Sequence, residues 1–527
     1  MHFIKKYWLL LAIISLGVAL RYNNNLGISL WHDEAFSALY IKYSWSEMMY
    51  RIGLDVHPPL YYIALRFWHY LFGDSLLGLR SFSIAMGAGL IPLSYAFVKS
   101  AFHNKKAALI VALLTAVNPF QLEYVTEVRM YTFGAFFALL AAYLLVLALN
   151  KQKEYNESLA KKTPHMPETY KLRQKMFWLY AGFALSTSAI MYTHYYLFFT
   201  AAALGLYALG MQYHLYKTDF KKYWPALASF ILIGLLYIPW LQTFLFQFQQ
   251  VSNSFWIPKM DIWSIPTTVW QMLLAFGIDI NNTNSKIFVS IAGLFSVGFI
   301  THFIWKTQEK AKWLILMAIL APFGGAILFV ILGYLRGAES SVFLVRYFLF
   351  ASVFFTLALG MWFAQLKPSL LAKALLFAYV VANLSAFALH WHDLNVNERP
   401  GMRAAAEYLK SNVTFGDKLY IGSSFEFFNY KYYNETSVKP LLYSGGNRDI
   451  KNLPHFAGTA ILTNEDLLPD FNESTQRGDT VWLLWTNGFG GSKPETPTSW
   501  EQVDERGFAE IRPYLGTWII VTHYKVK

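Results

Sequence analysis

The sequence lacks cysteine and is poor in charge. None of the 527 residues is Cys, which excludes disulfides and Cys-ligated metals, although this absence does not indicate a compartment. Only 14% of the residues are Asp, Glu, Lys or Arg, whereas 55% are hydrophobic and 18% aromatic. The apolar residues fall in long uninterrupted blocks that a soluble core would not need. The composition therefore indicates a polytopic membrane protein.

Acidic residues are fewer than basic ones, with 32 Asp and Glu against 44 Lys and Arg and a formal net charge of +12. The basic residues lie in short clusters between apolar blocks, where the positive-inside rule places them, so nucleic acid is not expected as a partner. The first block, Tyr7 to Leu20, follows two lysines and has no small-residue cleavage site after it. It predicts an uncleaved first helix.

Eleven apolar blocks are long enough to cross a hydrocarbon core about 30 Å thick, which takes roughly 20 residues before tilt and flanks are considered. They lie near residues 7–21, 82–98, 107–122, 130–149, 177–193, 195–212, 224–246, 287–305, 313–334, 346–366 and 374–390. We therefore expect a mainly α membrane domain of about 11 transmembrane helices over residues 1–390.

The first long loop, which follows the first span, decides the topology. Residues 58–72 reach only some 22 Å as a helix and carry Arg66 and His69, which are expensive at bilayer depth. If this segment does not span, the basic loops fall on the same side as Lys5 and Lys6. We therefore expect a cytoplasmic N-terminus, with residues 58–72 short or re-entrant on the outer face and two interfacial helices before them within residues 31–53.

The composition changes after the last span. From residue 391 onward, strand-length apolar stretches such as KLYIG, TAILT, TVWLLW and TWIIVTHY alternate with Gly, Asn, Asp and Pro turns and a helical segment, Met402 to Lys410. Residues 391–527 are predicted to form a soluble α/β domain on the outer side.

Ionisable residues collect at the outer ends of the predicted spans. They are Asp33, Glu34, Asp55, His57, Glu127, Arg129, His194, Arg336, Glu339 and Arg346. Because such groups are costly near bilayer depth unless they pair or function, one shared site is expected. Each also has a structural alternative: Asp33 and Glu34 suit the first turn of a helix, HPP a helix start, Glu127 with Arg129 a salt bridge, and Arg346 a headgroup anchor.

Several segments together resemble a known family. SLWHDEAFSALY, DVHPPLYY, GLRSFSIAMGAGLIPLSYAF, NPFQLEYVTEVRMYTFGAFFALL and RYFLF are similar to successive signatures of the family 39 type membrane glycosyltransferases. This group includes protein O-mannosyltransferases and the aminoarabinose transferase of lipid A. The resemblance covers roughly the first 150 residues and the RYFLF helix, and it implies the GT-C fold.

The resemblance implies an enzyme that moves a hexose or pentose from a polyprenyl phosphate carrier to an acceptor hydroxyl with inversion. Asp33 would act as general base, and Glu34 would bind the acceptor or orient Asp33. Donor and phosphate binding would fall to His57, Arg129, Arg346 and Tyr347. Sugar or acceptor binding would fall to Glu127, Tyr131, His194 and Tyr195. His57 replaces the lysine that aminoarabinose transferases carry at this position, and histidine is mostly neutral near pH 7.

No cofactor is expected to be required. A divalent cation is the alternative, since Asp33, Glu34, Glu127 and His194 imitate the acidic sites of oligosaccharyltransferases. The expected partners are the lipid-linked donor, membrane lipids and a protein, lipid or glycan acceptor. The rival function is a transporter or flippase of lipid-linked sugars. The spans are nearly free of charge at their centres, which favours an enzyme on the outer face of a plasma or inner membrane.

Overall fold

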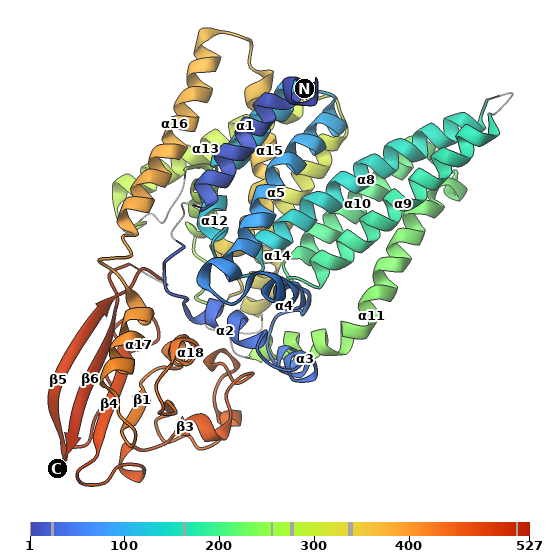
Figure 1. The fold of residues 1–527 in the computed structure, drawn as a ribbon. Coiled ribbons are helices and arrows are strands. Elements are labelled where there is room, and N and C mark those ends of the chain that lie inside the picture. The colour runs from blue at the N-terminus through green and yellow to red at the C-terminus, as the bar shows by residue number, and fades with distance from the viewer. Residues whose placement is uncertain are drawn as a thin grey trace. The chain divides into compact units, whose positions relative to one another are not determined.

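The computed structural model of the chain describes residues 2–22, 26–161, 165–253, 257–274, 279–335, 341–512 and 515–527. The chain divides into two compact units (Figure 1). The helical unit comprises residues 1–24, 81–245 and 255–390, and the mixed unit comprises residues 25–80, 246–254 and 391–527. Arg336 and Glu339 lie outside the described residues.

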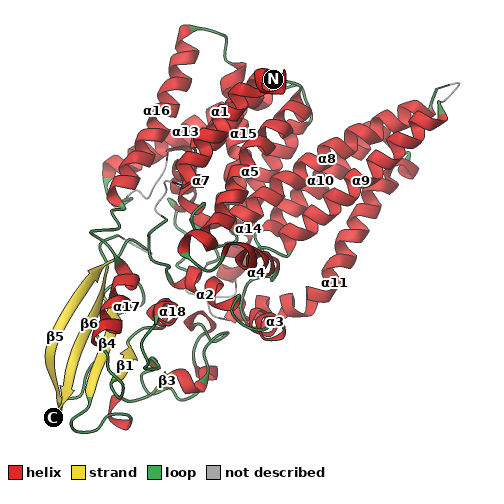
Figure 2. Cartoon of the chain, viewed as in Figure 1, coloured by secondary structure: helices red, strands yellow, loops and turns green. Residues whose placement is uncertain are grey.

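Each of the eleven predicted spans coincides with helical structure (Figure 2). The long helices that carry these spans, together with the shorter α7 and α12, are α1 (His2–Tyr22), α5 (Leu76–Phe102), α6 (Lys105–Val117), α7 (Pro119–Tyr124), α8 (Tyr131–Leu159), α9 (Met166–Met191), α10 (Leu197–Tyr216), α11 (Trp224–Asn253), α12 (Ser264–Leu274), α13 (Thr283–Lys306), α14 (Ala311–Leu335), α15 (Leu349–Gln365) and α16 (Leu370–Asp393). Within the described residues, seven helical segments are long and apolar enough to cross a membrane. The predicted fold class is thus confirmed, whereas the count of eleven spans stays a prediction.

The span predicted near residues 107–122 consists of two helices. Asn118 ends α6, and its side-chain oxygen accepts a hydrogen bond of 2.9 Å from the amide of Gln121. Pro119, which has no amide hydrogen, occupies the first position of α7. After this break, the short helix α7 leads into the loop that carries Glu127 and Arg129.

Helix α15 is the centre of the helical unit. It packs against α6, α8, α13 and α14, and nearly all of its side chains are buried. Gly360 permits the close approach of α6, because a Cβ atom there would lie 2.5 Å from the Val111 side chain. In a membrane the hydrophobic effect does not drive helices together. Small residues such as glycine then favour helix packing, because they let two backbones approach closely.

The first loop forms three helices in the mixed unit, as the sequence predicted: α2 (His32–Tyr40), α3 (Trp45–Leu54) and α4 (Leu60–Phe72). The 13 residues of α4 are too few to cross a bilayer. Its Arg66 donates hydrogen bonds to the Tyr43 carbonyl (2.6 Å) and the Tyr70 hydroxyl (2.8 Å), and lies 4.5 Å from the Trp45 ring. These contacts compensate the charge of Arg66 on an otherwise apolar helix.

The mixed unit contains a six-stranded sheet, which confirms the predicted C-terminal α/β fold. Its strands, in the order β3-β2-β1-β4-β6-β5, are β1 (Lys418–Ile421), β2 (Leu441–Tyr443), β3 (Leu467–Leu468), β4 (Thr480–Thr486), β5 (Trp500–Ala509) and β6 (Trp518–Val526). Strands β1 to β4 pair in parallel, and β6 pairs antiparallel with both β4 and β5. Helix α17 (Gly401–Asn412) packs on β5 and β6, and α18 (Ser424–Tyr433) packs on β1 and α2.

One predicted strand is wrong. The segment Thr459 to Thr463 is a turn in which the amides of Ile461 and Leu462 both donate to the Gly458 carbonyl. Ala460, Ile461 and Leu462 are buried, so their apolar character reflects core packing rather than strand pairing. Conversely, the charged strand β5 was not predicted, because most of its side chains are exposed.

Candidate active site

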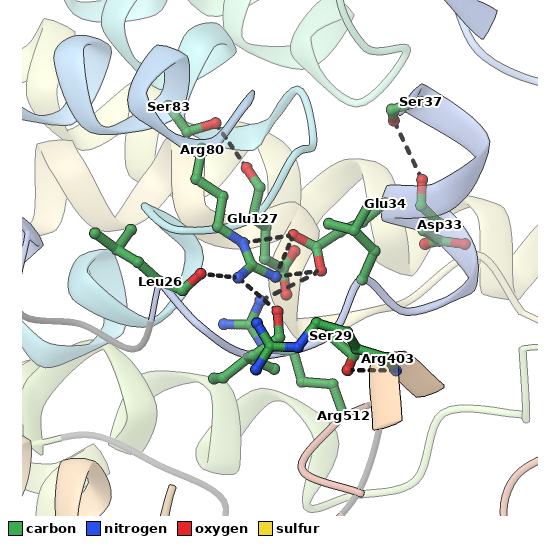
Figure 3. A network of polar contacts seen from close by, with 12 residues as sticks. Leu26, Ser29, Asp33, Glu34, Ser37, Arg80, Ser83, Glu127, Arg403 and Arg512 are labelled. Atoms are coloured by element: carbon green, nitrogen blue, oxygen red, sulfur yellow. Dashed lines mark hydrogen bonds and ion pairs between the residues drawn. The ribbon is translucent and has the colours of Figure 1, made fainter. Parts of the chain in front are cut away.

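Asp33 and Glu34 occupy the first turn of α2, but their side chains have different surroundings. The helix begins after Trp31, whose carbonyl accepts a hydrogen bond from the Ala35 amide. Neighbours on a helix point about 100° apart. Glu34 is fully buried, whereas Asp33 is only partly buried, and Figure 3 shows the two carboxylates directed to different sides. The Ser37 hydroxyl donates a hydrogen bond to the backbone carbonyl of Asp33. This bond does not involve the Asp33 carboxylate.

Glu34 is neutralised by arginines that the sequence interpretation did not assign to the site. Arg80 donates to both of its carboxylate oxygens at 3.1 to 3.4 Å, and Arg512 lies 3.8 Å away (Figure 3). Arg80 also donates to the carbonyls of Leu26 and Ile28. Arg80 directly precedes the apolar block of residues 82–98, so the sequence could have identified it as a candidate site residue. Arg512, almost 480 positions after Glu34, offered none.

Asp55 and His57 form a pair after the end of α3. His57 Nδ1 lies 3.4 Å from Asp55 Oδ2, and both side chains are about one sixth exposed. The side chain of Gln247 donates to the Ile52 and Gly53 carbonyls and therefore holds the end of α3. Burial lowers the pKa of the nearby His455 imidazole. The Asp55 carboxylate raises this pKa, and His57 lowers it further. A neutral imidazole is thus favoured at His455.

Glu127 and Arg129 lie in the loop between α7 and α8 and are both buried. Ser83 donates a hydrogen bond of 2.6 Å to the Glu127 carbonyl, and Thr132 donates to the Tyr124 carbonyl. Helix α5 thereby holds the middle of this loop, and α8 holds the end of α7 from which the loop begins. Burial of two ionisable side chains so close together in a membrane protein is expensive and favours a functional role.

Three predicted residues of the helical unit meet in one aromatic group. The ring centroids of His194 lie 4.7 Å from Tyr347 and 5.9 Å from Tyr131, and those two tyrosines lie 6.2 Å apart. His194 Nδ1 accepts a hydrogen bond from the Tyr196 amide, so a neutral imidazole carries its proton on Nε2. The rings are tilted against one another, and aromatic faces grouped in this way can bind the apolar face of a sugar.

Arg346 directly precedes Tyr347 in the short 3-10 helix Val345–Phe348, so its backbone lies beside this aromatic group. The Tyr195 hydroxyl accepts a hydrogen bond from the Trp240 indole, and its ring contacts Phe198 and Phe244.

The described part of the chain contains no group of three or more His, Asp or Glu side chains arranged to hold a metal ion. The site residues are thus distributed over two groups. The helical unit contains Glu127, Arg129, Tyr131, His194, Arg346 and Tyr347. The mixed unit contains Asp33, Glu34, Asp55, His57, Arg80 and Arg512.

Comparison with known proteins supports the fold. The family model of the dolichyl-phosphate-mannose-protein mannosyltransferases matches residues 56–159, a range that contains His57, Glu127, Arg129 and Tyr131. No curated protein matches the sequence.

The structure is similar to that of ArnT from Cupriavidus metallidurans, both bound to undecaprenyl phosphate and in the apo state. The bound form is 11% identical in sequence, with 98% of each chain covered and a TM-score of 0.58. The apo form is also 11% identical, with 97% of each chain covered and a TM-score of 0.58. The oligosaccharyltransferase AglB from Archaeoglobus fulgidus, in complex with an inhibitory peptide and a dolichol-phosphate, is 12% identical over 91% of this chain and 70% of its own, with a TM-score of 0.47. The chain is therefore a multi-pass membrane protein with the GT-C fold of membrane glycosyltransferases.

Proposed function

We propose that this protein is a membrane glycosyltransferase that moves a sugar from a polyprenyl phosphate to an acceptor hydroxyl. The observation that carries the proposal is the match of residues 56–159 to the mannosyltransferase family, because this range contains Glu127, Arg129 and Tyr131. ArnT, which shares the fold, binds undecaprenyl phosphate, a carrier of the proposed chemical class.

The proposed reaction is an inverting displacement with Asp33 as general base. The acceptor oxygen attacks the anomeric carbon, the bond from that carbon to the phosphate oxygen breaks, and the polyprenyl phosphate leaves with the electron pair. The acceptor proton passes to the Asp33 carboxylate. Glu34 is less suited to this role, since its oxygens are buried and engaged by Arg80.

The departing phosphate gathers negative charge, which needs positive partners. Arg129 and Arg346 are assigned to this role, with His57 and the Tyr347 hydroxyl as further donors. Glu127, Tyr131 and His194 are assigned to the sugar, because a carboxylate and aromatic faces suit hydroxyl groups and ring carbons. Tyr195, whose contacts are with Trp240 and Phe244, is assigned only a supporting role beside them.

The sugar donor would be reached from the outer leaflet, with the N-terminus in the cytoplasm and the C-terminal domain outside. Nucleotide sugars are made in the cytosol, so an outer site requires a donor already attached to a lipid. The acceptor is a protein, lipid or glycan hydroxyl, and no metal takes part in the proposed step.

The test is sugar transfer by purified protein from radiolabelled polyprenyl phosphate sugars to a membrane extract. Asp33→Asn is expected to lower the rate about 10²- to 10⁴-fold, because it removes the base while preserving size. Asp74→Asn is the matched control, since Asp74 is exposed and pairs with exposed Lys42 in the same unit. Undiminished transfer by Asp33→Asn would exclude Asp33 as base, and the absence of transfer from any such donor would favour transport.

A further inference from the structure

The buried carboxylate of Glu34 contacts an arginine from the far end of the chain. Arg512 Nη1 lies 3.8 Å from Glu34 Oε2, and the two side chains are 13% and 0% exposed. Arg512 follows the end of β5 by three positions. Because Arg80 engages both oxygens of Glu34, Arg512 is a second cation on the same buried anion.

Neighbouring contacts connect the start of α2 to the same C-terminal region. Ser29 donates to the Pro400 carbonyl at 2.9 Å, and the Leu30 amide donates to the Tyr433 hydroxyl at 2.9 Å. The His32 ring lies 5.0 Å from the Phe425 ring. The residues directly before Asp33 are therefore packed against residues 391–527.

Glu34 has little freedom to rearrange around these cations. Arg80 also donates to the Leu26 and Ile28 carbonyls, at 3.0 and 2.7 Å, so its guanidinium is held at three points. A buried ion pair has well-defined geometry because alternatives leave charge without a partner. Rotation of α2 about its axis would separate Glu34 from Arg512 and would turn the adjacent Asp33 with it.

We propose that Arg512 is a positioning residue that sets the orientation of the first turn of α2, and hence of the Asp33 carboxylate. The part that concerns Asp33 as a base rests on the proposed function. The C-terminal α/β region would then act on the reaction itself, by holding the base, and not only on the choice of acceptor.

The first measurement is hydrogen exchange of the α2 amides in the full-length protein. Arg512→Met is expected to speed exchange over residues 33–40 about tenfold, because one of two cations on a buried anion is lost. Arg512→Lys restores the charge and is expected to recover most of the protection. Arg506→Met is the matched control, since Arg506 is an exposed arginine of β5 that contacts Tyr408 and Phe508.

The second measurement is the steady-state kinetics of sugar transfer. Arg512→Met is expected to lower kcat about tenfold and to change the KM for the donor by less than about twofold, because a misplaced base affects the chemical step. In the Glu34→Gln background, Arg512→Met should add no further loss, since the shared contact is already absent.

Unchanged exchange in Arg512→Met, or an equal increase in Arg506→Met, would overturn the positioning role. Faster exchange with an unaltered kcat would overturn the connection to Asp33. If the wild-type protein transfers no sugar, the proposed function fails, and the exchange measurement still decides whether Arg512 orients α2.

Discussion

At the scale of single residues, Asp33 and Glu34 differ because neighbouring side chains on a helix point in different directions. In the first turn of α2 this leaves Asp33 partly exposed and Glu34 buried. Glu34 loses its hydration and is compensated by Arg80 and Arg512, whereas Asp33 keeps part of its surface accessible. Both residues were predicted to be catalytic, with Asp33 as the general base. Which of the two became the buried anion depended on Arg80 and Arg512.

Removal of Arg80 should destabilise the protein strongly. Arg80→Met removes the arginine that donates to both carboxylate oxygens of the buried Glu34, and we expect a loss of about 3 kcal/mol in the free energy of unfolding. Thermal and denaturant unfolding in detergent would measure this change. The double variant Glu34→Gln with Arg80→Met should recover part of the loss, because no uncompensated charge remains.

Lys42→Met is the control for this prediction. The Lys42 pair with Asp74 is exposed, so its removal should have far less effect than that of Arg80. Equal stability of Arg80→Met and wild type would show that the buried pair does not stabilise the fold.

At the scale of elements, helix α18 and the end of β5 bring two carboxyl groups together in the mixed unit. Glu426 and Glu510 are 3% and 4% exposed, and their nearest hydrogen-bond partners are the neutral Asn429 and Thr517 side chains. Burial raises the pKa of Glu510 to about 7, and burial together with the charge of Glu510 raises the pKa of Glu426 well above 4.5. The folded state therefore holds protons that the unfolded chain releases.

This difference predicts that the stability falls as the pH rises from about 4.5 through about 7. Because the folded pKa lies above the unfolded value, the stabilisation is complete below about pH 4.5 and is lost as the pH rises through about 7. For Glu510 alone the loss is on the order of 3 kcal/mol. Glu510→Gln should flatten the dependence of the unfolding midpoint on pH between 4.5 and 8. The exposed Glu501→Gln should leave the slope unchanged, and an unaltered slope in Glu510→Gln would contradict the prediction.

At the scale of the whole molecule, residues 25–80 cluster with residues 391–527 rather than with the helices that flank them in sequence. Ile28 is buried in one cluster with Leu394 and Ile511, and Phe36 lies 4.5 Å from the Phe428 ring. The first loop thus obtains its core from the C-terminal region. The sequence predicted domains of residues 1–390 and 391–527, and this division stays a prediction, because residues 25–80 and 246–254 cluster with residues 391–527.

A chain that ends at residue 390 should therefore lose the structure of its first loop. Without Leu394, Phe428 and Ile511, the apolar faces of residues 28–40 lose these packing partners, so we expect protease cleavage within residues 26–57 and loss of sugar transfer. Limited proteolysis in detergent, compared with the full chain, measures this. Equal protection of the loop in both chains would show that it folds without the C-terminal region.

The sequence by itself determined the membrane class, the long helices, the three helices of the first loop and the mixed C-terminal fold. These features follow from apolar runs and periodicity, which act over short stretches of chain. Residues such as Glu127, Arg129 and His194 were recognisable as candidates because charge beside an apolar span is costly. Only the tertiary structure decided that Glu34 is ion-paired, that Arg80 and Arg512 hold it, that Tyr195 packs against Phe244, and that Thr459 to Thr463 is a turn. Each of these depends on contacts between distant segments, which leave no periodic pattern in either segment alone.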